Sequence, residues 1–279
     1  MTHAIEPTNG EAASVALHLV CAVSDKAVLH RELLSSEALA QPRWPVAAVH
    51  IVHGARSAAD AANPALLRLS GLDVHGAASG DGSHRSRAGE AVAWVVWVHQ
   101  DVRLPGDWAW QFGQGLVEAQ RQWPALAVAG VYGLTGWGEQ AVRAGDIDDR
   151  GTALKEPTAL PCLASSLDEL LVAVRADSGL LFDAALGFDF YATDLCLQAQ
   201  ERGLQAAVVH APVMHASSTP RSGVAPRRVL ERIARSADAF EHKWAAHLPV
   251  FTPCFEIRRP GDVRAFIHQH FQPLDDEPS

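Results

Sequence analysis

One apolar run constrains the fold of this chain more than any other stretch. Residues 91–98 are all apolar, are rich in β-branched and aromatic types, and show no polar alternation. Such a run is typical of a strand buried on both faces, in the middle of a largely parallel sheet. The run ends in His99, Gln100 and Asp101. Because ligands of open α/β sheets bind beyond the carboxyl ends of the strands, these groups form a candidate site. The alternative is that Asp101 only caps the turn leading into residues 103–107.

Strand-like and helix-like segments alternate along the rest of the chain. The expected strands are residues 15–23, 46–52, 72–77, 125–132, 170–174 and 205–209. The expected helices follow Asp25, cover residues 58–69 and 108–122, and begin near residues 190 and 226. This alternation predicts an α/β fold with a mostly parallel central sheet flanked by helices. Residues 133–161 are expected to be a long irregular stretch, which is usually functional or mobile.

No internal repeat and no clear linker divides the sequence. We therefore expect one domain over residues 14–249, preceded by a disordered segment of residues 1–13 and followed by a C-terminal extension of residues 250–279.

Composition excludes several classes of partner and location. The formal charge of −9 and the pI near 5.8 argue against nucleic acid or an anionic membrane surface as the main partner, since both attract basic proteins. No apolar run approaches the roughly 20 residues of a membrane-spanning helix, and the polar start lacks the layout of a signal peptide. We therefore expect a cytoplasmic protein without a transmembrane segment. The four cysteines are far apart, so neither a zinc knuckle nor a disulfide framework is predicted.

Three carboxylates share a similar position in the predicted elements. Asp101, Asp168 and Asp194 each lie at the edge of a predicted strand or at the start of a predicted helix. If the strands are parallel neighbours, the three groups converge on one rim of the sheet, and His215 at the end of a later strand joins them. Such a cluster suits a divalent cation and a catalytic base around a phosphate-bearing ligand. The alternative for Asp194 is a helix N-terminal carboxylate stabilised by the macrodipole.

A resemblance to a known family rests on five motifs in order. They are residues 99–102 (His-Gln-Asp-Val), 167–169 (Leu-Asp-Glu), 188–199 (from Phe-Asp-Phe-Tyr to Asp-Leu-Cys-Leu-Gln-Ala), 215–218 (His-Ala-Ser-Ser) and 243–244 (Lys-Trp). Together they resemble the glycosyltransferase-like domain of streptomycin-biosynthesis type, a bacterial group similar to the inverting family 2 glycosyltransferases of the GT-A fold. The resemblance covers roughly residues 15–249.

The resemblance implies a hexosyltransferase-type enzyme, in which a sugar passes from a nucleotide-sugar donor to a hydroxyl of a glycan or small-molecule acceptor. It implies Asp101 as ligand of a divalent cation, Mn²⁺ or Mg²⁺, on the donor diphosphate. His99 takes the place of the first carboxylate of the usual Asp-x-Asp metal motif, and His215 completes the metal ligands. Asp194 then corresponds to the catalytic base, whereas Asp168, with Glu169 and Tyr191, is expected to contact substrate.

Two further residues are candidates for substrate contacts. Arg221 belongs to a basic stretch after His215, and it is expected to close over the diphosphate; the alternative is a solvated helix face. Trp137, in a Gly-Trp-Gly loop, is expected to touch an acceptor. Because His99 and His53 stand where the larger family has carboxylates, a non-catalytic nucleotide-sugar or glycan-binding module remains a second hypothesis. A metal-dependent hydrolase that uses His99, Asp101 and His215 is a third.

Overall fold

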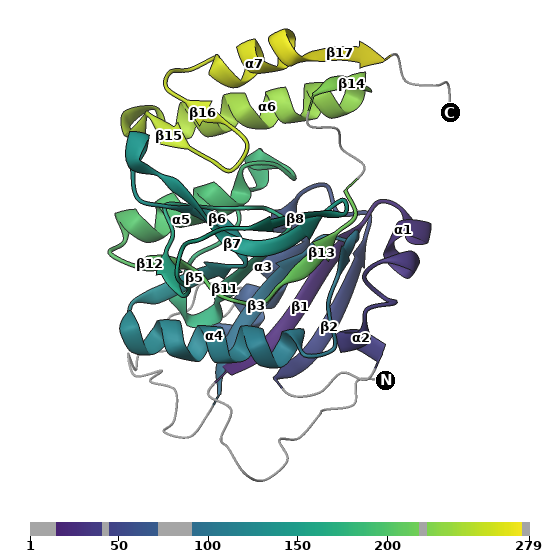
Figure 1. The fold of residues 1–279 in the computed structure, drawn as a ribbon, viewed down its shortest axis with the longest axis vertical. Coiled ribbons are helices and arrows are strands. Elements are labelled where there is room, and N and C mark those ends of the chain that lie inside the picture. Colours follow the sequence, from purple (N-terminus) through teal and green to yellow (C-terminus); the bar gives the residue numbers. More distant parts are fainter. Residues whose placement is uncertain (1–14, 41–44, 72–90, 218–221, 275–279) are drawn as a thin grey trace.

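The computed structural model describes residues 15–40, 45–71, 91–217 and 222–274. Its main sheet has seven strands in the order β2-β1-β3-β11-β5-β12-β9 (Figure 1). Their bounds are β1 Val15–Val23, β2 Val46–His53, β3 Val92–Val98, β5 Leu126–Gly130, β9 Cys162–Leu163, β11 Leu171–Arg175 and β12 Gln205–Val208. The predicted strands at residues 15–23, 46–52, 170–174 and 205–209 are thereby confirmed. The predicted strand 72–77 and the segment 1–13 lie outside the described residues.

The expectation of a mostly parallel sheet is wrong. The pairs β1–β2, β1–β3 and β5–β12 are parallel, whereas β3–β11, β11–β5 and β12–β9 are antiparallel. The reversed strand β11 therefore begins where β3 ends, with Leu171 opposite Val98. Asp168, which precedes β11, is brought to the end of β3 by this antiparallel pairing and not by parallel alignment.

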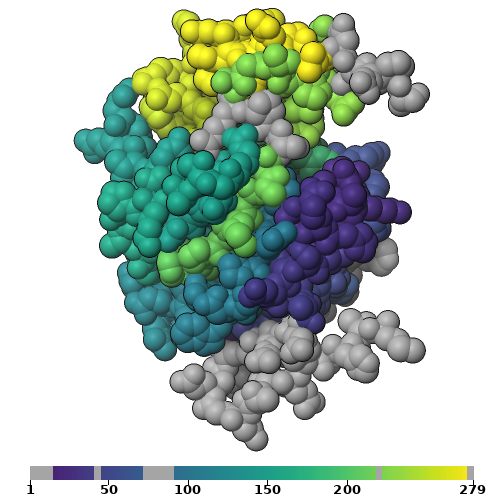
Figure 2. Space-filling view, turned by 45° about the vertical axis from the view of Figure 1, so that its right-hand side comes forward, coloured from purple at the N-terminus to yellow at the C-terminus, as the bar shows by residue number. Residues whose placement is uncertain are grey.

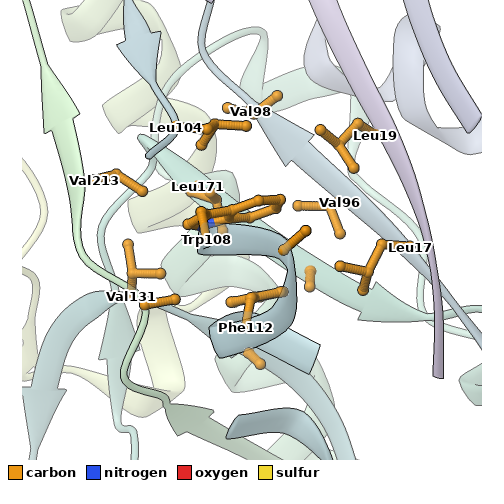
Figure 3. Close-up of a cluster of buried hydrophobic side chains, with 14 of the residues drawn as sticks. Leu17, Leu19, Val96, Val98, Leu104, Trp108, Phe112, Val131, Leu171 and Val213 are labelled. Atoms are coloured by element: carbon orange, nitrogen blue, oxygen red, sulfur yellow. The ribbon is translucent and has the colours of Figure 1, made fainter. Parts of the chain in front are cut away.

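Helices cover both faces of the main sheet, which explains the continuous apolar character of β3. Val96 packs on one face with Trp108 and Phe112 of α4, as Figure 3 shows, whereas Val95 and Trp97 pack on the other face under α3 and α5. The helices of the described residues are α1 Lys26–Arg31, α2 Glu37–Ala40, α3 Ala58–Leu69, α4 Trp108–Gln122, α5 Tyr191–Glu201, α6 Arg227–Lys243 and α7 Asp262–His270. Short 3₁₀ turns are η1 Gly138–Gln140, η2 Ala176–Ser178, η3 Ala184–Leu186 and η4 Ala245–His247. Among the described residues, no helix has the length and apolar character needed to cross a membrane.

A second sheet occupies the stretch that the sequence predicted to be irregular. Its order is β10-β6-β7-β13-β4, with β8 added beside β7. The strands are β4 Val102–Arg103, β6 Tyr132–Thr135, β7 Val142–Asp149, β8 Thr152–Lys155, β10 Ser166–Leu167 and β13 Val213–His215. The prediction of a loop over residues 133–161 is thus wrong, and the single strand predicted over 125–132 divides between the two sheets.

The residue types in these strands explain why the sequence pattern did not predict them. β7 carries three aspartates and Gly145, types that are depleted in strands, and only Val142 and Ile147 are β-branched. Gly145 is required, because its φ is 127° and a Cβ there would lie 2.4 Å from the carbonyl oxygen of Val131. Arg150 and Gly151, both at positive φ, make the two-residue turn of the β7–β8 hairpin.

The C-terminal residues form a layer over one end of the molecule. Figure 1 shows α6 and α7 side by side at the top, and Figure 2 shows the yellow segment of α7 and β17 (Phe271–Leu274) as a cap above the teal second sheet. Phe190 and Leu197 of the α5 region pack there with Phe240, Trp244 and Ile257. Two small strand pairs, β14 Gly223–Pro226 with β17 Phe271–Leu274 and β15 Val250–Phe251 with β16 Glu256–Ile257, complete the layer. Residues 250–274, predicted to be an extension, share this apolar cluster with the domain.

Candidate functional site

A tight turn at the end of β3 carries the first two candidate ligands. The backbone N–H of His99 donates to the carbonyl of Leu170 at 3.0 Å, and that of Val102 donates to the carbonyl of His99 at 3.2 Å. Gln100 points away toward β1, where its side-chain oxygen accepts the N–H groups of Ser24 and Asp25, each at 3.0 Å. The turn is therefore anchored on both sides, and Asp101 lies beside His99 with 3.9 Å between Oδ1 and Nδ1.

Strand register brings His215 to this turn. β13 pairs with β4 so that His215 lies opposite Val102, and the N–H of Ala216 donates to the carbonyl of Asp101 at 2.8 Å. β13 also runs parallel to β7, with His215 opposite Asp149. The imidazole therefore lies between two carboxylates. Nε2 is 3.5 Å from Asp101 Oδ1, and Nδ1 is 3.1 Å from Asp149 Oδ1.

The hydroxyl of Tyr191 determines which nitrogen of His99 carries the proton. This hydroxyl lies 2.8 Å from Trp97 Nε1, which can only donate, and 2.7 Å from the carbonyl of Glu169, which can only accept. Its single hydrogen goes to Glu169, so His99 Nε2, at 2.7 Å, must donate to the hydroxyl oxygen. His99 Nδ1 is then a bare lone pair that faces Asp101.

Burial and charge act differently on the two histidines. Burial lowers the pKa of His99 to about 4, so its ring is neutral at pH 7. Although burial opposes it, the carboxylates of Asp101, Asp168 and Asp149 raise the pKa of His215 above its usual value. The same contact with His215 lowers the pKa of Asp101, against the effect of its burial.

The three side chains fit a metal ion. His99, Asp101 and His215 each offer one ligand atom, and these atoms all lie within 4.8 Å of one another. His215 Nε2 is buried and has no hydrogen-bond partner among the described residues, because Asp101 at 3.5 Å is beyond good hydrogen-bond geometry. Asp149 on Nδ1 and Tyr191 on the ring of His99 match the outer contacts that orient metal-binding imidazoles. Atoms bound to one ion at about 2.1 Å lie roughly 3.0–3.5 Å apart, so the cluster needs only a modest contraction.

A cavity of about 630 Å³ opens beside this cluster, lined by His99 and His215 among others. Its polar wall also carries Asp168 and Glu169, whose pKa values burial raises, for Glu169 well above its usual range. Neither carboxylate forms an ion pair with any residue in the described part of the chain. Both groups line the cavity, and the substrate contacts that the sequence predicts for them stay a prediction.

The structure does not bring Asp194 to this cavity. Its carboxylate is fully buried in the first turn of α5, where Oδ1 lies 2.7 Å from Lys243 Nζ and accepts the Trp244 indole N–H at 2.8 Å. Oδ2 accepts from Gln198 Nε2 at 2.6 Å. These contacts join α5 to the end of α6, and Asp194 is not among the residues that line the cavity. The placement does not favour the predicted role as base, which stays a prediction.

Two other residues predicted to contact substrate are not among those that line the cavity. Tyr191 has no exposed surface and holds His99 instead of facing a ligand. Trp137 is 57% exposed and borders a separate small hollow with Leu163 and Gln205, away from the metal cluster. Arg221 lies outside the described residues.

Sequence reasoning missed two contributors to the site. Asp149 was hidden in the stretch expected to be irregular, and only the Arg-Gly pair that follows it marks a hairpin turn. Arg232 lies on α6, where its guanidinium donates to both carboxylate oxygens of Asp189 at 3.0 Å and borders the cavity. No local pattern marks that pair, because it joins two distant segments.

The role of Tyr191 gives a testable expectation. Tyr191→Phe removes the acceptor of the His99 Nε2 proton and frees the ring to change tautomer, so Mn²⁺ affinity should fall roughly 10- to 100-fold. Electron paramagnetic resonance of free Mn²⁺ during titration measures this. Tyr132→Phe is the matched control, because that hydroxyl donates to Glu156 and contacts neither histidine. Equal affinities in the two variants would contradict the tautomer argument.

Comparison with models of known protein families and with curated proteins gives no match for this chain.

Proposed function

We propose that this chain is a metal-assisted glycosyltransferase of GT-A type that transfers a sugar from a nucleotide-activated donor to an acceptor hydroxyl, with inversion. The observation that supports it most is the His99–Asp101–His215 cluster at the end of the central strand β3, beside a cavity lined by the half-buried carboxylates of Asp168 and Glu169. A diphosphate donor needs a cation, and an acceptor hydroxyl needs a base; this edge of the sheet offers residues for both.

The residues around the cluster have two roles in cation binding: some are ligands, and others orient the ligands. His99 Nδ1, Asp101 Oδ1 and His215 Nε2 would bind it, while Tyr191 and Asp149 fix the two rings. Three protein ligands leave positions open for diphosphate oxygens. When bound, the cation neutralises the charge that develops on the leaving diphosphate.

The nature of the ligands favours one of the two expected cations. Imidazole nitrogen is a poor ligand for Mg²⁺, which prefers oxygen, whereas Mn²⁺ accepts a mixed set more readily. We therefore propose Mn²⁺ over Mg²⁺.

Glu169 replaces Asp194 as the proposed base. Its carboxylate lines the cavity, and burial together with Asp189 and Asp168 raises its pKa. A base with a pKa nearer to neutrality takes a hydroxyl proton more effectively. In the proposed step the acceptor O–H bond breaks and its proton passes to Glu169. The acceptor oxygen then bonds to the anomeric carbon as the bond to the diphosphate oxygen breaks, and Asp168 accepts hydrogen bonds from sugar hydroxyls.

A donor panel tests the proposal. The full chain is incubated with UDP-, GDP- and dTDP-sugars and a mixture of simple acceptors, with Mn²⁺ or Mg²⁺, and products are read by mass spectrometry. We expect transfer with at least one donor, faster with Mn²⁺. Donor cleavage without transfer would favour the metal-dependent hydrolase, which the same three ligands also suit. Thermal stabilisation by a donor without turnover would favour the binding module, and no response to any donor would contradict the proposed glycosyltransferase.

A further inference from the structure

One wall of the cavity is aromatic. Ring centroids lie 5.6 Å apart for Phe190–Phe255, 5.3 Å for Phe255–Phe266 and 6.4 Å for Phe266–Phe271. All four rings line the cavity, and they come from the start of α5 and from the C-terminal layer. The row is therefore built by segments far apart in the sequence.

This phenylalanine row has exposed apolar surface, whereas the core residues beneath it do not. Phe240, Ile257 and Val263 of the same apolar cluster are fully buried, whereas Phe255, Phe266 and Phe271 are only half-buried. Ile233 of α6 and Ile267 of α7 extend this half-buried surface around the cavity. Covering apolar surface with an apolar ligand is favourable, and cavities of this size accept molecules of a few rings.

The polar wall of Asp168 and Glu169 lines the same cavity. Neither carboxylate forms an ion pair among the described residues, although Arg143 and Arg232 act on them at longer range, and their oxygens suit the hydroxyl groups of a ligand head. A ligand that satisfies both walls has hydroxyls at one end and an apolar body at the other.

We propose that this cavity binds an amphipathic small-molecule acceptor, with hydroxyl groups at Asp168 and Glu169 and an aromatic or short alkyl body against the phenylalanine row. This deepens the proposed function, on which the word acceptor rests. The binding itself depends on neither donor nor metal.

Cys254 reports occupancy of the cavity. It is exposed and lines the cavity, so a bound ligand should slow its alkylation by iodoacetamide. Cys21 and Cys196 are buried, with the pKa of Cys21 raised to about 12, and should stay unmodified in the folded protein. Cys162 is half-buried and outside the cavity lining, which makes it the reference thiol.

The experiment compares phenyl β-D-glucoside with methyl β-D-glucoside on the full chain. Alkylation of each cysteine is followed by peptide mass spectrometry at increasing glucoside concentrations. Because the phenyl ring buries several more apolar carbons, we expect it to half-protect Cys254 at a concentration at least about tenfold lower than the methyl compound. Cys162 should be unaffected by either.

Substitutions in the cavity test whether the aromatic wall causes the preference for the phenyl glucoside. Phe266→Ala and, as a second test, Ile233→Ala should remove most of the tenfold preference. Phe251→Ala, a half-buried phenylalanine outside the cavity lining, should keep it. Equal protection by both glucosides, no protection by either, or an unchanged preference in both cavity variants would overturn the proposal. Because this readout needs no turnover, it stands or falls separately from the donor panel.

Discussion

Asp101→Asn is expected to abolish Mn²⁺ binding and sugar transfer while leaving the chain folded. The asparagine has the same shape, but it lacks the negative charge, and its amide N–H groups would face the histidine lone pairs. Removing a direct ligand should weaken Mn²⁺ binding by more than the roughly 10- to 100-fold seen for outer contacts. Transfer should fall at least in proportion, since the diphosphate would leave without a cation. Calorimetric titration with Mn²⁺ and the transfer assay measure the two effects.

Asp146→Asn is the matched control for this substitution. Asp146 is on β7 of the same second sheet, but it pairs with Lys155, whose side chain is 77% exposed, and it does not line the cavity. Its replacement should change neither Mn²⁺ affinity nor transfer. Mn²⁺ binding within about threefold of the unmodified protein in Asp101→Asn would contradict the proposed metal centre.

Asp194→Asn is expected to destabilise the chain without removing activity from the molecules that remain folded. The substitution breaks the 2.7 Å ion pair with Lys243 and leaves an amide N–H beside buried donors. Losing one partner of a buried pair and misplacing a hydrogen bond should lower the free energy of unfolding by roughly 2–4 kcal/mol. Urea unfolding followed by tryptophan fluorescence gives the value, because Trp244 donates to this carboxylate.

Asp183→Asn separates the effect of Asp194 from that of its shared lysine. Asp183 lies 2.8 Å from the same Lys243 Nζ, but its side chain is 31% exposed. Solvent screens that pair, so its loss should cost less than about 1 kcal/mol. A catalytic base would show the opposite pattern in Asp194→Asn: unchanged unfolding and a loss of turnover. That result would restore the role first assigned from the sequence.

The sequence pattern predicts where the central strands end. It does not predict whether neighbouring strands run parallel or antiparallel. The apolar run of β3 and the polar residues after it are read correctly, because burial on both faces requires that pattern. Nothing in residues 170–174 distinguishes a parallel from an antiparallel strand, since both are fully apolar when central. Asp168 thus reaches the site through a strand direction opposite to the one assumed.

The rest of the site depends on pairings that a local pattern does not encode. His215 and Asp149 meet only because β13 joins β4 on one side and β7 on the other. Asp194 occupies the expected place at the start of a helix, but two of its partners, Lys243 and Trp244, come from the end of α6, about fifty residues later. A helix-start carboxylate has the same sequence context whether it faces a ligand or a neighbouring helix.

The three-residue strand β13 also has a consequence for how the chain holds together. Its histidine faces ligands from the turn at residues 99–101, so a cation bound there would join two points separated by nearly half of the domain's sequence. A cross-link that closes so long a loop lowers the conformational entropy of the unfolded chain. The cation would therefore serve as a cross-link between the two sheets. Its removal should first destabilise the strands at which the second sheet adjoins the main sheet.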